Sequence, residues 1–189
     1  MLFRSVRPRR TLCSGVGGLE LGLHLALDSY RTVCYVEREA AAAAILVARM
    51  EEGILAPAPV WDDLATFDGR RWCGCVDVVS AGFPCQPFSV AGSQRGIDDE
   101  RWLWPDIARI LGDVRTRYVF LENVPPIVTH GLGHILGTLA EGGFAAEWDC
   151  FRASDVGAPH RRERWFLLAY AEDAGGRVIT GGASGSQGT

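Results

Sequence analysis

Short apolar runs alternate with helical patterns over most of this 189-residue chain. Apolar runs separated by helices are typical of a mainly parallel sheet, because each parallel connection needs a crossover that a helix supplies. Seven runs qualify as strands: residues 11–13, 32–36, a weak one around 60, 76–81, 118–121, 145–150 and 165–169. The alternation predicts one α/β domain, and a chain of this size can bury a core without disulfides or metal staples.

Four segments are predicted as helices. The alanine-rich residues 39–52 have the strongest helical pattern, and 103–111 can carry Pro105 in a first turn. A third helix lies within 130–141. Leucines alternate with a period of two over residues 19–27, which is typical of a strand. We still predict a helix there, because the segment follows a glycine-rich turn and leucine lacks the β-branching common in strands.

Composition and charge exclude several classes of protein. The net charge of −4 argues against a simple basic nucleic-acid coat protein. The longest apolar run, residues 40–48, is too short to span a bilayer, and no secretory signal is recognisable. The six cysteines form no CxxC pair and have no histidine at zinc spacing. We therefore expect an intracellular protein with reduced thiols and no metal site.

A glycine-rich turn and a following carboxylate indicate a nucleotide-like cofactor. Ser14, Gly15, Gly17 and Gly18 follow the first predicted strand, and Glu37 ends the second. Glycines let the backbone approach a ligand closely, and a carboxylate at a strand end can accept hydrogen bonds from ribose hydroxyls. The alternative is a tight turn with a surface glutamate, because the full GxGxxG spacing is missing.

Cys85 is the candidate nucleophile. It lies between Pro84 and Pro87, directly after the apolar run 76–81. Open α/β sheets place their sites at the carboxyl ends of strands, and the prolines would stiffen a loop that presents a thiolate there. The alternative is a small buried thiol, as most cysteines are.

Three further charged residues end or precede predicted strands. Glu122 follows the run 118–121, where a partly desolvated carboxyl can have a raised pKa and donate a proton. Arg162 and Arg164 share a face if their segment is extended, so both could face one anion or carbonyl. A solvated strand-end glutamate and a basic surface strand are the alternatives.

In this order, these segments resemble the motifs of the DNA cytosine-5 methyltransferase family. The resemblance covers about residues 10–171 and rests on the glycine-rich loop, GFPCQPFS at 82–89, ENV at 122–124 and HRRER at 160–164. His160 stands where the family usually has glutamine. The resemblance implies an α/β fold of the class I S-adenosylmethionine-dependent methyltransferases, which is Rossmann-like with a seven-stranded, mostly parallel sheet.

The resemblance also implies roles for individual residues. The cofactor would be S-adenosylmethionine, with Glu37 at its ribose and Asp63 at the adenine amino group. The remaining cofactor-binding positions would be Ser14, Gly15, Gly17, Gly18, Pro84 and Leu103. Cys85 would add to carbon 6 of cytosine and Glu122 would bind ring nitrogen 3. Arg164, with Arg162, would hold the carbonyl of the base.

The substrate implied is DNA with the target cytosine swung out of the helix. We expect a basic extension at 1–10, a catalytic domain at 11–173 and a flexible tail at 174–189. This organisation lacks the family's target-recognition domain and closing cofactor segment, so a second chain or a missing C-terminal region is expected as a partner. The chain would be a fragment, one half of a split enzyme or a decayed gene product.

The expected setting is the cytoplasm of a prokaryotic or phage-infected cell, in a restriction-modification system. Two other functions stay open from the sequence. One is an inactive remnant that binds a cofactor or a partner. The other is a cysteine hydrolase that pairs Cys85 with a histidine base, for which the chain offers His24, His130, His134 and His160.

Overall fold

The computed structural model of the chain describes residues 10–12, 15–27, 30–84 and 102–171. Seven strands lie in or beside the seven predicted ranges. They are β1 (Arg10–Leu12), β2 (Tyr35–Val36), β3 (Val60–Trp61), β4 (Val78–Gly82), β5 (Tyr118–Asn123), β6 (Phe144–Arg152) and β7 (Glu163–Ala171). The α/β architecture is confirmed.

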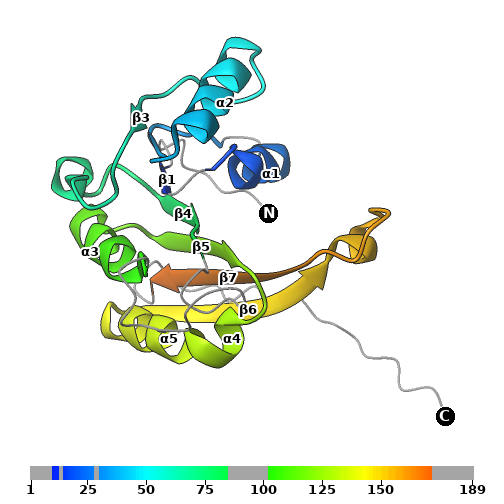
Figure 1. The fold of residues 1–189 in the computed structure, drawn as a ribbon. Helices are drawn as coiled ribbons and strands as arrows, with labels where there is room; N and C mark the ends of the chain where they lie inside the picture. Colours follow the sequence, from blue (N-terminus) through cyan, green and yellow to red (C-terminus); the bar gives the residue numbers. More distant parts are fainter. Residues whose placement is uncertain (1–9, 13–14, 28–29, 85–101, 172–189) are drawn as a thin grey trace.

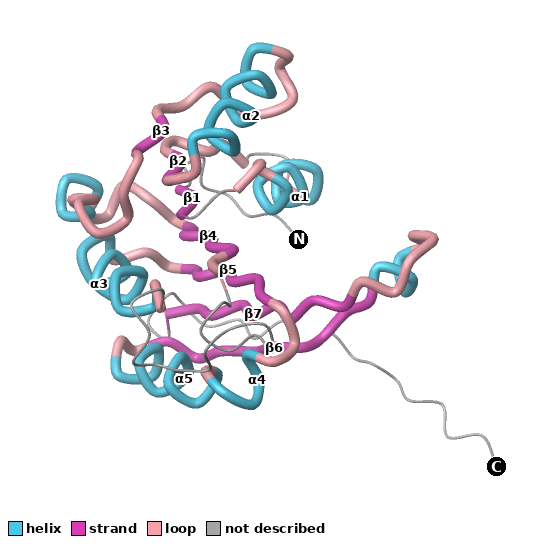
Figure 2. The backbone as a smooth tube through the Cα atoms, viewed as in Figure 1, coloured by secondary structure: helices cyan, strands magenta, loops and turns pink. Residues whose placement is uncertain are grey.

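The pairing of the strands differs from a single seven-stranded sheet. Five strands form one sheet in the order β1-β4-β5-β7-β6, and β2 and β3 form a second, parallel pair. The pairs β1·β4 and β4·β5 are parallel, whereas β7 is antiparallel to β5 and β6. β2 and β3 have two residues each, too few for an extended ladder of hydrogen bonds. They lie beside β1, so the two sheets continue one layer (Figure 2).

The predicted helices are all present. α1 (Gly18–Ala26) confirms the helical interpretation of the leucine-rich segment, and α2 (Ala40–Glu51) and α3 (Trp104–Val114) match their predicted ranges. The third predicted region divides into α4 (Ile127–His130) and α5 (Leu132–Glu141). The described residues also include two short 3₁₀ helices. η1 (Gly69–Trp72) lies between β3 and β4, and η4 (Ala153–Val156) lies at the end of the β6–β7 hairpin. Figure 1 shows α3, α4 and α5 on one side of the layer of strands and α1 and α2 on the other side.

Two apolar clusters hold these layers together. The larger one packs α3 and α5 against alternate residues of β5 and β7, such as Leu121 and Leu167, which are both fully buried. This period of two is what a sheet face requires. The smaller cluster joins Tyr35, Leu46 and Leu55 beside the glycine-rich turn.

Some predictions fall outside the described residues. The basic extension lies outside them except for Arg10, and so does the tail at 174–189, so the domain limits stay predictions. In the part of the chain that the structure describes, no helix is both long enough and apolar enough to cross a bilayer. The same residues include no group of three or more His, Cys, Asp or Glu side chains arranged to hold a metal ion.

Candidate active site

The strand directions bring four chain segments to one edge of the five-stranded sheet, the edge formed by the carboxyl ends of its parallel strands. Register pairs Leu12 with Ala81, Ala81 with Leu121 and Gly82 with Glu122, so β1, β4 and β5 end together. β7 is antiparallel to β5, so its first residues, not its last, lie at this edge. The glycine-rich turn, the segment that leads to Cys85, Glu122 and Arg164 therefore meet at this edge, where open α/β sheets bind ligands.

Glu122 and Arg164 form the central pair of this edge. Nε of Arg164 donates to Oε1 of Glu122 at 2.8 Å, and both side chains are about three-quarters buried. Nη1 of Arg164 donates to the carbonyl of Glu163 at 2.8 Å. Nη2 of Arg164 has no hydrogen-bond partner among the described residues. Among the described residues, Nη2 of Arg164 and Oε2 of Glu122 are thus the polar atoms of this pair without a hydrogen-bond partner.

Burial raises the pKa of Glu122 above the ordinary range of glutamate. The positive charges of Arg164 and Arg162 and the hydrogen bond from Arg164 act in the opposite direction, and they do not cancel the effect of burial. A raised pKa favours the protonated form of a carboxyl, which is the form that can donate a proton or a hydrogen bond.

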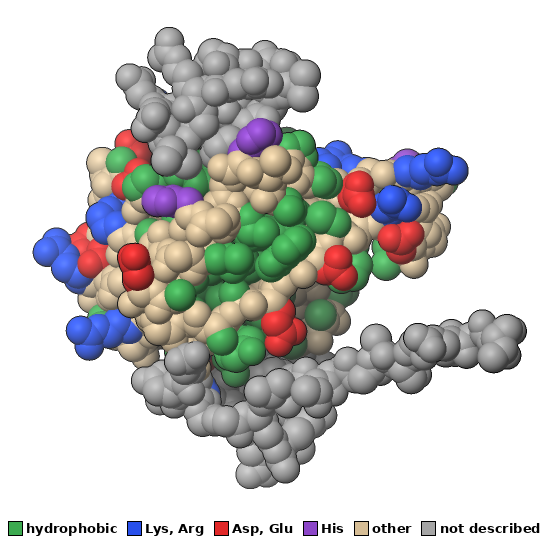
Figure 3. Space-filling view, turned by 90° about the horizontal axis from the view of Figure 1, so that it is seen from below, with side chains coloured by type: hydrophobic (Ala, Val, Ile, Leu, Met, Phe, Trp, Pro, Cys, Tyr) green, Lys and Arg blue, Asp and Glu red, His purple; other side chains and the backbone are tan. Residues whose placement is uncertain are grey.

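Arg162 is close enough to affect Glu122 electrostatically but does not contact it. Its side chain is exposed, without a hydrogen-bond or ion-pair partner in the described part of the chain. Arg162 and Arg152 belong to the end of the β6–β7 hairpin, which projects from the body and carries arginine and acidic side chains together (Figure 3).

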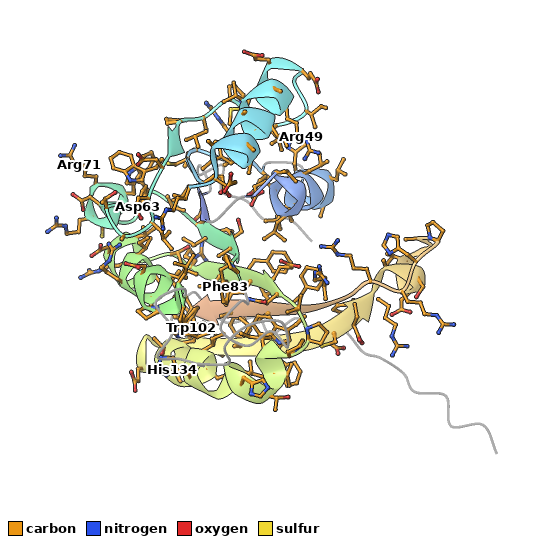
Figure 4. All side chains as sticks on the ribbon, in the orientation of Figure 1. Arg49, Asp63, Arg71, Phe83, Trp102 and His134 are labelled. Atoms are coloured by element: carbon orange, nitrogen blue, oxygen red, sulfur yellow. The ribbon has the colours of Figure 1, made fainter. Side chains whose placement is uncertain are left out.

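Asn123 links the ends of β4 and β5, a role that sequence reasoning missed. Its side chain is 3% exposed. Nδ2 donates to the carbonyl of Phe83 at 3.1 Å, and Oδ1 accepts from the backbone N–H of Val124 at 2.8 Å. Figure 4 shows Phe83 where β4 ends. Burial alternates along β5, which turns Asn123 inward with Val119 and Leu121, but the continuous apolar run 118–121 gives no such alternation in the sequence.

The glycine-rich turn is bound to Glu37 on the neighbouring strand. The backbone N–H of Gly15 donates to Oε2 of Glu37 at 2.7 Å, and the N–H of Glu39 donates to Oε1 at 2.7 Å. On the other side, Arg49 of α2 donates to the carbonyl of Val16. Two consecutive residues of the turn, Gly15 and Val16, are therefore held by side chains from other elements.

Two glycines of this turn have left-handed backbones. Gly15 has φ +52° and open space where a side chain would stand. Gly17 has φ +78°, and a Cβ there would meet Cδ1 of Leu55 at 2.5 Å. The first glycine leaves room for a ligand and the second allows close packing against the core.

Asp63 lies at the corresponding edge of the small sheet. Because β2 and β3 are parallel and Val36 pairs with Trp61, Glu37 and Asp63 both follow carboxyl ends of adjacent strands. Oδ1 of Asp63 accepts from the N–H of Ala65 at 2.9 Å, which closes a tight turn. This placement fits a ligand whose sugar and base lie across two neighbouring strand ends.

The other predicted site residues divide into two groups. Pro84 is exposed just after β4, Gly18 begins α1, and Leu103 is half-buried directly before α3. Cys85 and Ser14 lie outside the described residues. His160 is exposed at the hairpin, where its Nδ1 accepts from the N–H of Arg162 at 3.4 Å.

The fold is shared with known methyltransferases. The Schizosaccharomyces pombe protein Dnmt2 superposes with a TM-score of 0.70 at 24% identity, over 92% of this chain and 54% of that one. An Entamoeba histolytica methyltransferase superposes with a TM-score of 0.72 at 17% identity, over 91% of this chain and 56% of that one. At these identities the likeness shows the fold.

Sequence comparisons reach curated relatives. The type II methyltransferase M.CviJI of Paramecium bursaria Chlorella virus IL3A is 33% identical over 92% of this chain and 44% of its own length. M.NaeI of Lentzea aerocolonigenes is 35% identical over 84% of this chain and 38% of its own length. The chain thus spans less than half the length of these two relatives. The profile of the C-5 cytosine-specific DNA methylase family matches residues 10–180, and the chain belongs to that family.

Proposed function

We propose that this chain carries the catalytic half of an enzyme that transfers a methyl group from S-adenosylmethionine to carbon 5 of cytosine in DNA. The observation that supports this most is the pair of Glu122 and Arg164, which lies beside Gly82, three residues before Cys85. Family membership supports the reaction class, and the shared edge supports the assignment of residues.

The residues present fit the proposed cofactor. The open space at Gly15, the carboxylate of Glu37 and the turn at Asp63 follow one another along the strand ends, in the order that an amino-acid moiety, a ribose and a base would need. When bound, S-adenosylmethionine supplies a methyl group on a positively charged sulfur. Gly18, Pro84 and Leu103 would complete the pocket, together with Ser14.

The chemistry of cytosine explains why this site needs a thiol, a carboxyl and a guanidinium. Carbon 5 is a poor nucleophile until a thiolate adds at carbon 6, which we assign to Cys85. Glu122 would donate a proton or hydrogen bond to ring nitrogen 3, and its raised pKa suits that role. Nη2 of Arg164, which has no partner among the described residues, would bind the carbonyl of the base while Nε keeps Glu122 in position. Once carbon 5 has taken the methyl group, with S-adenosylhomocysteine as the other product, water would accept the carbon 5 proton. Cys85 would then leave carbon 6 as a thiolate and ring nitrogen 3 would return its proton to Glu122, which releases the product.

The target base must leave the duplex to reach this edge, at a cost of a few kcal/mol. Arg162, exposed and unpaired among the described residues, lies near enough to bind the DNA backbone or the base at this step. Further DNA contacts and sequence recognition are assigned to a partner chain or a further region of the protein. A place in a restriction-modification system, as for the type II relatives, belongs to the same proposal.

Trapping on a modified base tests the proposal. A duplex with 5-fluorocytosine in candidate sites and S-adenosylmethionine is offered to the chain as given, and in parallel to the chain extended by any reading frame that follows it. Fluorine cannot leave as a proton does, so the adduct with the thiol should persist under denaturing electrophoresis. Peptide mapping should locate it at Cys85, and Cys85→Ser should abolish it.

Cys150→Ser is the matched control. Burial, helped by the nearby charges of Glu163 and Asp149, raises the pKa of the Cys150 thiol, so this cysteine is a poor nucleophile and its loss should leave the adduct intact. An adduct on any cysteine other than Cys85 would refute the assignment. Cofactor binding without an adduct in either form of the protein would favour an inactive remnant.

A further inference from the structure

Arg109 of α3 binds the turn that follows Asp63. Its Nη1 donates to the carbonyl of Phe67 at 2.9 Å, and its Nη2 donates to the carbonyls of Leu64 at 2.8 Å and Ala65 at 3.2 Å. One guanidinium thus binds three carbonyl groups within four residues. A planar fork of N–H donors can do this, whereas an ammonium cannot match the geometry.

The guanidinium is itself held in place from its own helix. Asp106 accepts from Nη2 at 3.3 Å, and Asp113 lies 3.6 Å from Nη1. These carboxylates stand one turn before and one turn after Arg109, so they orient the side chain along the helix. The guanidinium therefore has a carboxylate on each side along the helix, at a position where the Arg109 side chain is 39% exposed.

A second contact joins the same two parts of the chain. Gly69 of η1 packs so closely on α3 that a Cβ there would lie 2.7 Å from Cβ of Asp113. The segment from Asp63 to η1 is therefore docked on α3 at both of its ends. Figure 4 shows Asp63 between β3 and α3, with Arg71 pointing away from the body.

Hydrogen bonds within the turn and to Trp61 restrict its conformation further. The hydroxyl of Thr66 donates to the carbonyl of Asp63 at 3.2 Å and accepts from Nε1 of Trp61 at 3.1 Å. Together with the N–H of Ala65 on Oδ1 of Asp63, these bonds connect Asp63 to the residues that Arg109 binds. The position of the Asp63 carboxylate relative to α3 then depends on Arg109 as well as on the packing of Gly69, and of the two it is Arg109 that binds the turn itself.

We infer that Arg109 is a positioning residue that sets the Asp63 carboxylate for recognition of the adenine amino group. The inference rests on the proposed function and adds a residue that the proposal does not include. Leu103 directly precedes the helix that carries Arg109, so α3 would help to position two of the proposed cofactor-binding residues, Leu103 and Asp63.

The test compares two probes that differ only at the group Asp63 would bind. S-adenosylhomocysteine carries a 6-amino donor, and S-inosylhomocysteine carries an oxygen acceptor there. Titration calorimetry on the full 189-residue chain gives the dissociation constant of each. The unmodified chain should prefer the adenosyl compound by about tenfold or more, the value of one hydrogen bond to a charged group. In Arg109→Gln this preference should fall towards one.

Two variants separate positioning from general stability. Arg71→Gln changes an exposed arginine of the same docked segment and should leave the preference unchanged. Asp63→Asn should lower the preference by itself, and adding Arg109→Gln to it should lower the preference no further. If Arg109→Gln fails to fold, Arg109→Lys keeps the charge and should give an intermediate preference.

The outcomes are distinguishable. If Arg109→Gln weakens both compounds equally and keeps the preference, Arg109 supports only the fold and the inference is refuted. If the unmodified chain bound both compounds with equal affinity, Asp63 would not recognise the adenine amino group, and the inference would be refuted as well. If the unmodified chain bound neither compound, the proposed cofactor site itself would be wrong.

Discussion

Replacing Gly17 by alanine should destabilise the protein for two separable reasons. The backbone there has φ +78°, which costs a residue with a Cβ about 1–2 kcal/mol. The new Cβ would also lie 2.5 Å from Cδ1 of Leu55 and 3.0 Å from Cδ2 of Leu46. Both leucines are buried in the smaller cluster, so relief of this overlap should cost a further ~1–3 kcal/mol. The expected loss is the sum, about 2–5 kcal/mol.

Gly53→Ala is the matched control for this prediction. Gly53 has nearly the same backbone, φ +74°, but nothing lies within 4 Å of the position that a Cβ would occupy. Its variant should show the conformational cost alone. The difference between the two variants is then the cost of packing against Leu55 and Leu46.

Urea unfolding followed by circular dichroism measures both losses. The difference of about 1–3 kcal/mol should appear as a lower urea midpoint for Gly17→Ala at an unchanged slope. If Gly17→Ala is no less stable than Gly53→Ala, the close approach of the turn to Leu55 does not exist in solution. The argument that packing requires glycine at this position would then be refuted.

Two further predictions concern β5. Because burial raises the pKa of Glu122, its ionised form costs stability, and this cost grows as the pH rises from about 4.3 through the folded-state pKa. Glu122→Gln should therefore be at least as stable as the unmodified chain near pH ~7.5 while losing the 5-fluorocytosine adduct. In urea unfolding, a larger loss of unfolding free energy for the variant, relative to the unmodified chain, at pH ~7.5 than at pH ~4 would contradict this. Asn123→Ala should cost about 2–4 kcal/mol in urea unfolding, since it leaves the carbonyl of Phe83 and the N–H of Val124 without partners, and a loss below about 0.5 kcal/mol would contradict it.

Much of the local structure could be predicted because it depends on side-chain periodicity. The alanine-rich segment became α2 almost residue for residue, and the short apolar runs became strands at the expected places. The leucine-rich segment shows the limit of this reasoning. Its period of two suits a strand, yet it forms α1, and Leu25 is left 78% exposed on the helix surface. The position after a glycine turn outweighed the periodicity.

A sequence can indicate positions near strand ends, whereas it does not mark side chains that act through backbone groups. Glu122 lies near the end of β5, Glu37 directly after β2 and Asp63 shortly after β3, and their roles in the site stay predictions. Arg109 lies inside a helix and binds carbonyl groups more than forty residues earlier in the chain. Every residue has a carbonyl group, so nothing in the sequence marks these three as the acceptors.

The order of motifs and the alternation of strands and helices thus determined the family, the fold class and the candidate residues. Only the tertiary structure decided how those residues meet. β7 runs antiparallel between β5 and β6, and this brings its first residues, including Arg164, to the edge where Glu122 lies near the end of β5. Strand direction and register depend on contacts between residues far apart in the chain, and the local patterns that specify a strand are the same in either direction.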